Sequence, residues 1–157
     1  MRIPLLSVVL AAALCGCTAG APGSGSSGGS ATTSNATTTS IAISLTASVV
    51  TSTPYGSSGG FMPAVTTVKA GTYVVFVNKD SFAHTSTSMS ATSFPAASPF
   101  GSSALTASGT TLSGGWSTGA LAPNNASQKL LADKPGTYLY GCFFHYGAPM
   151  RGAIVVR

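Results

Sequence analysis

The chain has 157 residues, enough for one domain with appendages and too few for two domains of ordinary size. Charged residues make up only 6% of it, against roughly 25% in ordinary soluble domains, and the formal net charge is +5. The few lysines and arginines are dispersed along the sequence, so we expect no nucleic-acid partner.

The first residues have the features of an export signal. Arg2 precedes the apolar run 5–14, which is too short to span a bilayer as a helix and is typical of a signal peptide. The segment 14–17 resembles the lipobox of bacterial lipoproteins, whose last cysteine, here Cys17, is lipidated. We therefore predict a signal peptide over 1–16 and a cell-envelope lipoprotein, held by its lipid in the periplasm or at the outer cell surface.

The alternative is an ordinary signal peptide cleaved near Ala19 or Ala21, which would leave no lipid. In either case the segment 17–40 is rich in Gly, Ser, Thr, Ala and Asn, with too little apolar surface to offset the entropy of ordering it. We predict a flexible tether there. The globular domain is predicted to cover 41–157.

From Ile41 onward the pattern favours β-strands, because apolar and polar residues alternate and Gly and Pro recur at short intervals. No sustained helical period occurs, so the predicted fold class is an all-β sandwich. Between about 90 and 126 we expect irregular or short helical structure. The expected elements are strands at 41–49, 65–69, 72–78, 85–89, 127–131, 136–142 and 153–156, a loop at 54–60, and a hairpin turn at Ala70-Gly71 that joins two of the strands.

Cys142 is the only cysteine of the predicted domain, so no disulfide can form within it. A lone thiol in an exported protein is buried and inert, reactive, or bound to a metal. Cys142, His145 and Met150 follow one another at the spacing C-x2-H-x4-M, between two predicted strands. Soft sulfur with imidazole selects copper, and one Cys, two His and a weak axial Met form blue-copper centres. The second imidazole would come from His84, the only other histidine, on the loop after 72–78.

At these residues the sequence resembles the cupredoxins, in the plastocyanin and pseudoazurin branch. The resemblance covers about 41–157 and is strongest at its two ends. It departs from the family at Thr85, where plastocyanins commonly have Asn, and in a polar insertion between Met89 and Leu121. The residues that carry the resemblance are Val68-Lys69-Ala70-Gly71, Phe76-Val77-Asn78, His84, Pro135-Gly136-Thr137-Tyr138, Tyr140, Cys142, His145, Met150 and Gly152.

This resemblance implies a Greek-key β-sandwich of about eight strands that holds one copper ion. His84 and His145 would be the imidazole ligands, Cys142 the thiolate ligand and Met150 the axial ligand. With no ligand position open to a substrate, we expect an electron carrier and not an enzyme. The copper would cycle between Cu(I) and Cu(II).

In the family the electron leaves through the exposed histidine of the loop, here His145, across an apolar patch. We expect a monomer that docks briefly to redox proteins through this patch. The residues expected to form it are Phe82, Ala83, Gly147, Ala148 and Pro149.

Of three other functions, two remain open at this point and the histidine count excludes the enzymes. A protein that stores or delivers Cu(I) would favour methionine clusters, and the four methionines are scattered. A multicopper oxidase or nitrite reductase needs further histidine clusters and a second domain, whereas this sequence has two histidines. A metal-free binding lipoprotein would be the interpretation if the four predicted ligands did not converge.

Overall fold

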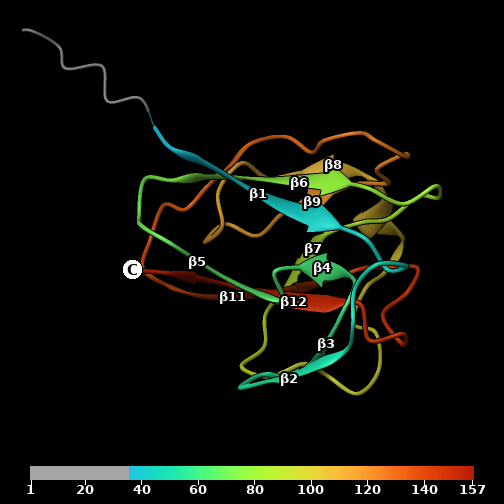
Figure 1. Cartoon of the computed structure of the whole chain (residues 1–157). Coiled ribbons are helices and arrows are strands. Elements are labelled where there is room, and N and C mark those ends of the chain that lie inside the picture. Colours follow the sequence, from blue (N-terminus) through green and yellow to red (C-terminus); the bar gives the residue numbers. More distant parts are fainter. Residues whose placement is uncertain (1–35) are drawn as a thin grey trace, which may run out of the picture. The chain divides into compact units, whose positions relative to one another are not determined.

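The computed structural model describes residues 36–157 (Figure 1). The predicted signal peptide (1–16), the lipidation site Cys17 and nearly all of the predicted tether (17–40) lie outside the described residues, so they stay predictions. Within the described residues, no helix is long and apolar enough to cross a membrane.

Two β-sheets carry the fold, as the sequence predicts for a sandwich. The four-stranded sheet has the order β10-β6-β1-β4, the six-stranded sheet has the order β5-β12-β11-β7-β9-β8, and β2 pairs with β3 alone. The strands are β1 (Thr38–Ile43), β2 (Thr51–Thr53), β3 (Gly56–Ser58), β4 (Phe61–Met62), β5 (Val65–Val68), β6 (Tyr73–Asn78), β7 (Thr87–Met89), β8 (Ala107–Ser108), β9 (Ser117–Thr118), β10 (Leu130–Leu131), β11 (Gly136–Gly141) and β12 (Arg151–Val156).

The core lies between the two large sheets, and the period-two pattern of the strands explains it. In β6 every second residue is buried, so Val74, Phe76 and Asn78 all face inward. Ile41 and Ile43 of β1 are fully buried beside them. The four apolar side chains among these share one hydrophobic cluster with Cys142, Met150 and residues of β11 and β12, so the core extends up to the predicted copper ligands.

The predicted hairpin at Ala70-Gly71 is wrong, although both of its strands form. β5 pairs in parallel with β12 of the six-stranded sheet, whereas β6 pairs in parallel with β1 of the other sheet. The turn therefore carries the chain from one layer to the other. Turn residues indicate that the chain reverses, but they do not determine which strand becomes the hydrogen-bonded neighbour.

Other boundaries also differ from the sequence prediction. β1 begins at Thr38, inside the predicted tether, and ends at Ile43, so the predicted strand 41–49 is too long. The predicted loop 54–60 contains β3, which forms a short hairpin with β2. The insertion between Met89 and Leu121 contains a 3-10 turn at Ser102–Leu105 and the short strands β8 and β9, close to the irregular structure expected there.

Tyr140 of β11 is the largest fully buried side chain of the described residues. Its ring meets Phe61 and Phe76 edge to face, with centroids 4.8 and 5.1 Å away. Its hydroxyl has no hydrogen-bond partner among the described residues, and burial raises the pKa of Tyr140 well above 10.0. The ring therefore contributes packing, while the hydroxyl contributes an uncompensated desolvation cost.

We expect Tyr140→Phe to leave the free energy of unfolding unchanged or to raise it, because it removes only the unpaired hydroxyl. Tyr140→Ala should cost about 3–5 kcal/mol, because it leaves a cavity. Urea unfolding of the two variants measures both effects. A loss above about 1 kcal/mol in Tyr140→Phe would show that the hydroxyl has a partner.

Candidate metal centre

Three of the four predicted ligands lie together. The Nδ1 atoms of His84 and His145 are each 3.7 Å from the Sγ atom of Cys142 and 3.2 Å from each other. His84 and Cys142 are fully buried, and His145 is partly exposed. His84 lies 58 positions before Cys142 and 61 before His145 in the chain, yet each of the three residues directs one nitrogen or sulfur atom toward a common point.

The loop after β6 places His84. Asn78, the buried last residue of β6, donates its amide N–H groups to the carbonyls of Phe82 and Leu121 and accepts from the N–H of Asp80. His84 then exchanges two backbone hydrogen bonds with Leu121, of 3.2 and 2.7 Å. The loop after β6 is therefore held by the Asn78 side chain and by the paired backbone hydrogen bonds between His84 and Leu121.

The loop after β11 places the other ligand candidates, and Figure 1 shows it at the same end of the sandwich as the loop after β6. The Cys142 N–H donates to the Met150 carbonyl at 3.0 Å, and the Met150 N–H donates to the His145 carbonyl at 3.2 Å. These bonds close the segment 142–150 on itself. One closed loop therefore carries both the sulfur and the imidazole, which lie 3.7 Å apart.

Thr85 joins the two loops. Its backbone N–H donates to the Cys142 sulfur at 3.4 Å, and its hydroxyl accepts from the Phe143 N–H at 2.9 Å. The sequence flags Thr85 only as a departure from the Asn of plastocyanins. The structure shows that the threonine hydroxyl also links the two ligand loops and that the backbone supplies the hydrogen bond to sulfur.

Asp80 is a residue of the site that the sequence interpretation missed. Its carboxylate lies 2.9 Å from Nε2 of His84 and is almost fully buried. Burial alone would raise the pKa of Asp80, but hydrogen bonds from Thr46, Leu45, His84 and Ser44 outweigh it and lower the pKa from 3.8 to about 2. The one available signal was the i, i+4 spacing of Asp80 and His84, which is too common to be specific.

The pKa of His84 is lowered, first by burial and then by His145, against the opposing effects of Asp80. A lowered pKa favours the neutral imidazole, in which one ring nitrogen keeps its lone pair. Nε2 faces the Asp80 carboxylate and is the natural site of the proton, so the lone pair falls on Nδ1. That atom faces the Cys142 sulfur.

Met150 lies at the end of the same loop and is fully buried. Its side chain packs against Gly60, whose φ is +73°. A Cβ atom on Gly60 would contact Cγ of Met150 far inside van der Waals distance and would lie 3.1 Å from its sulfur. Glycine is thus required at this position both by its backbone and by the thioether beside it.

The donor set fits a metal ion. A point equidistant from the two Nδ1 atoms and the sulfur lies about 2 Å from each, which is the length of a metal–imidazole bond. Thiolate with two imidazoles is the set that copper prefers in trigonal sites. His84, Cys142 and His145 are also the one group of metal-binding type found among the described residues.

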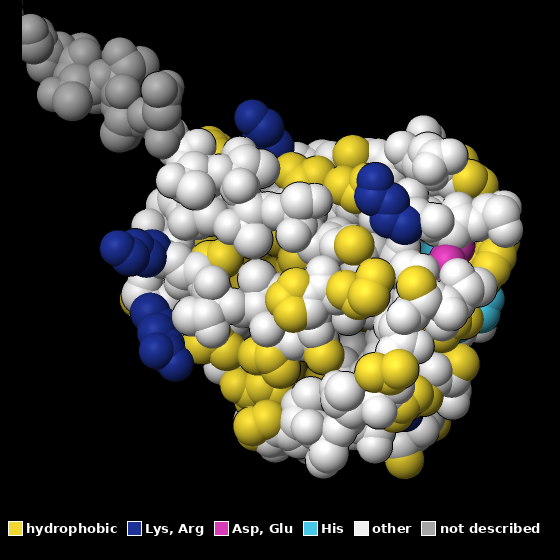
Figure 2. All heavy atoms as spheres, viewed as in Figure 1, with side chains coloured by type: hydrophobic (Ala, Val, Ile, Leu, Met, Phe, Trp, Pro, Cys, Tyr) yellow, Lys and Arg dark blue, Asp and Glu magenta, His cyan; other side chains and the backbone are white. Residues whose placement is uncertain are grey.

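The surface around His145 is apolar. Phe82 is 36% exposed and its ring lies 5.4 Å from the His145 ring, while Gly147 and Ala148 are exposed and Pro149 is partly exposed. Figure 2 shows histidine at the right edge of the molecule bordered by hydrophobic side chains. Ala83, the fifth residue predicted for the patch, is partly exposed, as Pro149 is.

Phe144 also belongs to this surface, and the sequence prediction omitted it. It is 45% exposed, and its ring centroid lies 6.1 Å from that of His145. A phenylalanine next to a predicted ligand can equally belong to the hydrophobic core, so its position in the sequence did not indicate that it is exposed.

The chain belongs to the plastocyanin/azurin family of copper binding proteins, whose family model matches residues 48–157. The domain is therefore a cupredoxin, and its cofactor is copper. A comparison with curated proteins gave no match.

Several solved structures resemble the chain. A purple cupredoxin from Nitrosopumilus maritimus is 19% identical, over 75% of this chain and 98% of that one, with a TM-score of 0.47. Plastocyanin from Dryopteris crassirhizoma is 22% identical, over 76% and 100%, with a TM-score of 0.46. A copper-containing nitrite reductase from Thermus scotoductus is 24% identical over 62% of this chain but only 20% of its own length, with a TM-score of 0.43.

Gly60→Ala should displace the Met150 side chain. Gly71→Ala is the matched control, because Gly71 also has positive φ (+86°) but a Cβ there meets no atom within 4 Å. Both substitutions should lose roughly 1–2 kcal/mol of unfolding free energy from the backbone conformation, and Gly60→Ala about 1–3 kcal/mol more from overpacking. Equal losses in urea unfolding would contradict the contact with Met150.

Proposed function

We propose that this domain is a mononuclear blue-copper electron carrier, with His84, Cys142, His145 and Met150 as its ligands. The observation that carries the proposal is the triangle of two imidazole nitrogens and one thiolate sulfur at 3.2–3.7 Å, held by two loops that are hydrogen-bonded to each other. The copper would supply reversible one-electron chemistry, accepting an electron from a reduced protein and passing it to an oxidised one.

The residues around the site do the remaining work. Cys142 and His84 are fully buried, so the protein excludes water from most of the site. The Thr85 N–H on the sulfur stabilises a thiolate. The hydrogen bonds between the two ligand loops would limit their rearrangement between the two oxidation states, which would keep the barrier to electron transfer small. Since the sequence has no histidine beyond these two, it offers no second copper centre of the kind that a reductase or oxidase uses.

His145 is the partly exposed member of the triangle, and it lies within the apolar surface of Phe82, Ala83, Phe144 and residues 147–149. We propose that electrons enter or leave here by brief docking of redox proteins. A weakly charged apolar surface favours short-lived encounters over a stable complex. We further propose that the protein is a monomer at the cell envelope, exported by residues 1–16 and anchored by a lipid on Cys17.

Addition of one equivalent of Cu(II) to the apo protein should produce an intense blue colour and a reversible one-electron couple. Cys142→Ser should abolish the colour, because the thiolate is the donor of the charge-transfer band. Binding of Cu(I) with no reversible couple would instead indicate storage or delivery of copper. A protein that stays colourless and binds no copper would contradict the proposal.

Met150→Leu should keep copper bound but raise the reduction potential, because it removes an axial electron-pair donor and the more highly charged Cu(II) loses more stabilisation than Cu(I). We expect a shift of about 59 mV, a tenfold change in the Cu(I)/Cu(II) ratio. The control is Met62→Leu, at a methionine that is 36% exposed in β4 and paired with Ala42. Potentials that are the same in both variants would exclude Met150 as a ligand.

Ala148→Asp should slow electron self-exchange between two copies about tenfold at low salt, because two like charges would meet in the docked pair. High salt should reduce the effect. Ala70→Asp is the matched control, since Ala70 is exposed in the turn before β6, at the opposite end of that strand from the site. If both variants slow exchange equally, the docking surface lies elsewhere.

A further inference from the structure

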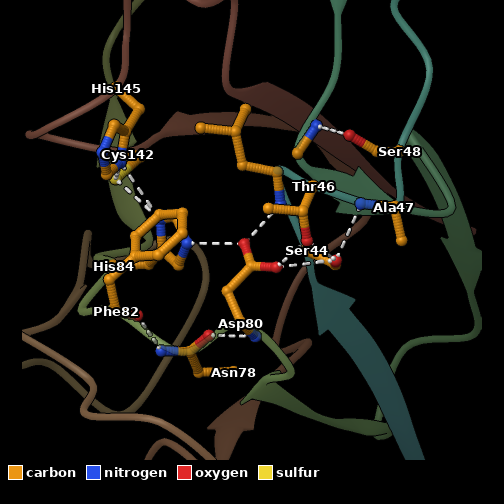
Figure 3. A network of polar contacts seen from close by, with 12 residues as sticks. Ser44, Thr46, Ala47, Ser48, Asn78, Asp80, Phe82, His84, Cys142 and His145 are labelled. Atoms are coloured by element: carbon orange, nitrogen blue, oxygen red, sulfur yellow. Dashed lines mark hydrogen bonds and ion pairs between the residues drawn. The ribbon is translucent and has the colours of Figure 1, made fainter.

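Asp80 is a buried carboxylate that points at the imidazole of a predicted copper ligand (Figure 3). Its Oδ2 atom lies 2.9 Å from Nε2 of His84, with the two side chains 1% and 0% exposed. The opposite ring nitrogen of His84, Nδ1, faces the Cys142 sulfur at 3.7 Å. The imidazole thus lies directly between a carboxylate and the point where the three donor atoms converge.

The surroundings hold Asp80 as an anion. The Leu45 N–H donates to Oδ2 at 2.6 Å, and the hydroxyls of Ser44 and Thr46 donate to Oδ1 at 2.9 and 2.5 Å. These groups come from the turn after β1, so another element of the fold provides the donors. A buried carboxylate without such donors would be strongly disfavoured. Within the described part of the chain, the contact between Asp80 and His84 is the one close contact between an acidic and a basic side chain.

We propose that Asp80 is a positioning and tuning residue of the copper site: by accepting the Nε2–H bond of His84 it aims Nδ1 at the metal, and its negative charge lowers the reduction potential. This inference rests on the proposed function. It adds to the site a residue that contacts a ligand and not the metal, held by the turn after β1. The spacing of the ligands in the sequence does not indicate this residue.

The physical argument is electrostatic. A carboxylate hydrogen-bonded to a ligand imidazole fixes its tautomer and raises its basicity, so the nitrogen donates more strongly to a metal. A fixed negative charge is attracted more strongly to Cu(II) than to Cu(I), because the oxidised ion carries one more positive charge. Burial reduces the screening of this attraction by water. Asp80 therefore stabilises the oxidised state more than the reduced state.

A purely structural role for Asp80 would be to tie the turn after β1 to the loop after β6. The potential separates the two roles, because a structural tie alone has no reason to favour one oxidation state. Asp80→Asn retains the size of the side chain and an oxygen acceptor for His84 but removes the charge. Asp133→Asn is the control: it is the only other acidic residue of the sequence, it is exposed, and it changes the net charge equally.

The experiment compares the reduction potentials of the copper-loaded wild type, Asp80→Asn and Asp133→Asn, together with their visible and paramagnetic resonance spectra. We expect Asp80→Asn to raise the Cu(I)/Cu(II) ratio at a fixed electrode potential about tenfold, which is 59 mV for one electron. The blue spectrum should persist, and Asp133→Asn should stay at the wild-type value. An unchanged or lower potential in Asp80→Asn overturns the inference.

A second measurement covers the case in which Asp80→Asn fails to fold. In wild-type protein, nitrogen-15 magnetic resonance of the His84 ring should show a slowly exchanging proton on Nε2 in both the apo and Cu(I) forms. A proton on Nδ1 in the apo form, or a rapidly exchanging Nε2 proton, overturns the inference without any variant. Ser44→Ala removes one donor to Asp80 but leaves its charge in place, so it should not raise the potential as Asp80→Asn does.

Failure of the inference and failure of the proposed function give different results. If wild-type protein binds no copper or has no reversible couple, the proposed function fails and the inference with it. If wild-type protein is blue and redox-active while Asp80→Asn and Asp133→Asn have equal potentials, the electron carrier stands and only the role of Asp80 is lost.

Discussion

The site depends on the closed loop between Cys142 and Met150. Backbone hydrogen bonds hold this loop, from the Cys142 N–H to the Met150 carbonyl and from the N–H groups of Ala148 and Met150 to the His145 carbonyl, so the chain itself defines much of its shape. The loop leaves β11 and returns directly into β12, which are antiparallel neighbours. Its position is therefore fixed by the sheet itself. His84 can join Cys142 and His145 because the loop after β6 ends at the same pole.

Hydrogen bonds between the loop after β6 and the loop after β11 then define how the ligand side chains lie relative to one another. The N–H of Thr85 donates to the Cys142 sulfur, and its hydroxyl accepts from the Phe143 N–H. One residue of the loop after β6 thus makes two hydrogen bonds with the loop after β11. Asp80 and Asn78 brace the same loop from within the core. A site held in this way suits the proposed electron carrier, because such a carrier needs ligands that move little when one electron arrives.

Prediction from the sequence worked best where the evidence is local. Cys142, His145 and Met150 are close in the sequence, and their spacing alone places sulfur and imidazole on one loop. The alternation of residue types in β6 likewise predicted which of its side chains are buried, and the apolar and aromatic residues of β11 predicted a strand that contributes to the core. The prediction failed where pairing is non-local: the chain reversal at Ala70-Gly71 is real, yet its two strands belong to different sheets because each finds its partner far along the sequence.

The sequence by itself determined the all-β class, the strands that line the core and the chemical types of the donor atoms, because composition, period and spacing are properties of neighbouring residues. Only the tertiary structure decided that His84 meets Cys142, that Thr85 supplies the N–H to sulfur, and that the carboxylate of Asp80 lies on the far side of the His84 ring, held by Ser44 and Thr46. The reason is physical: the partners of a backbone amide or a buried charge are chosen by packing between segments, which no local pattern records.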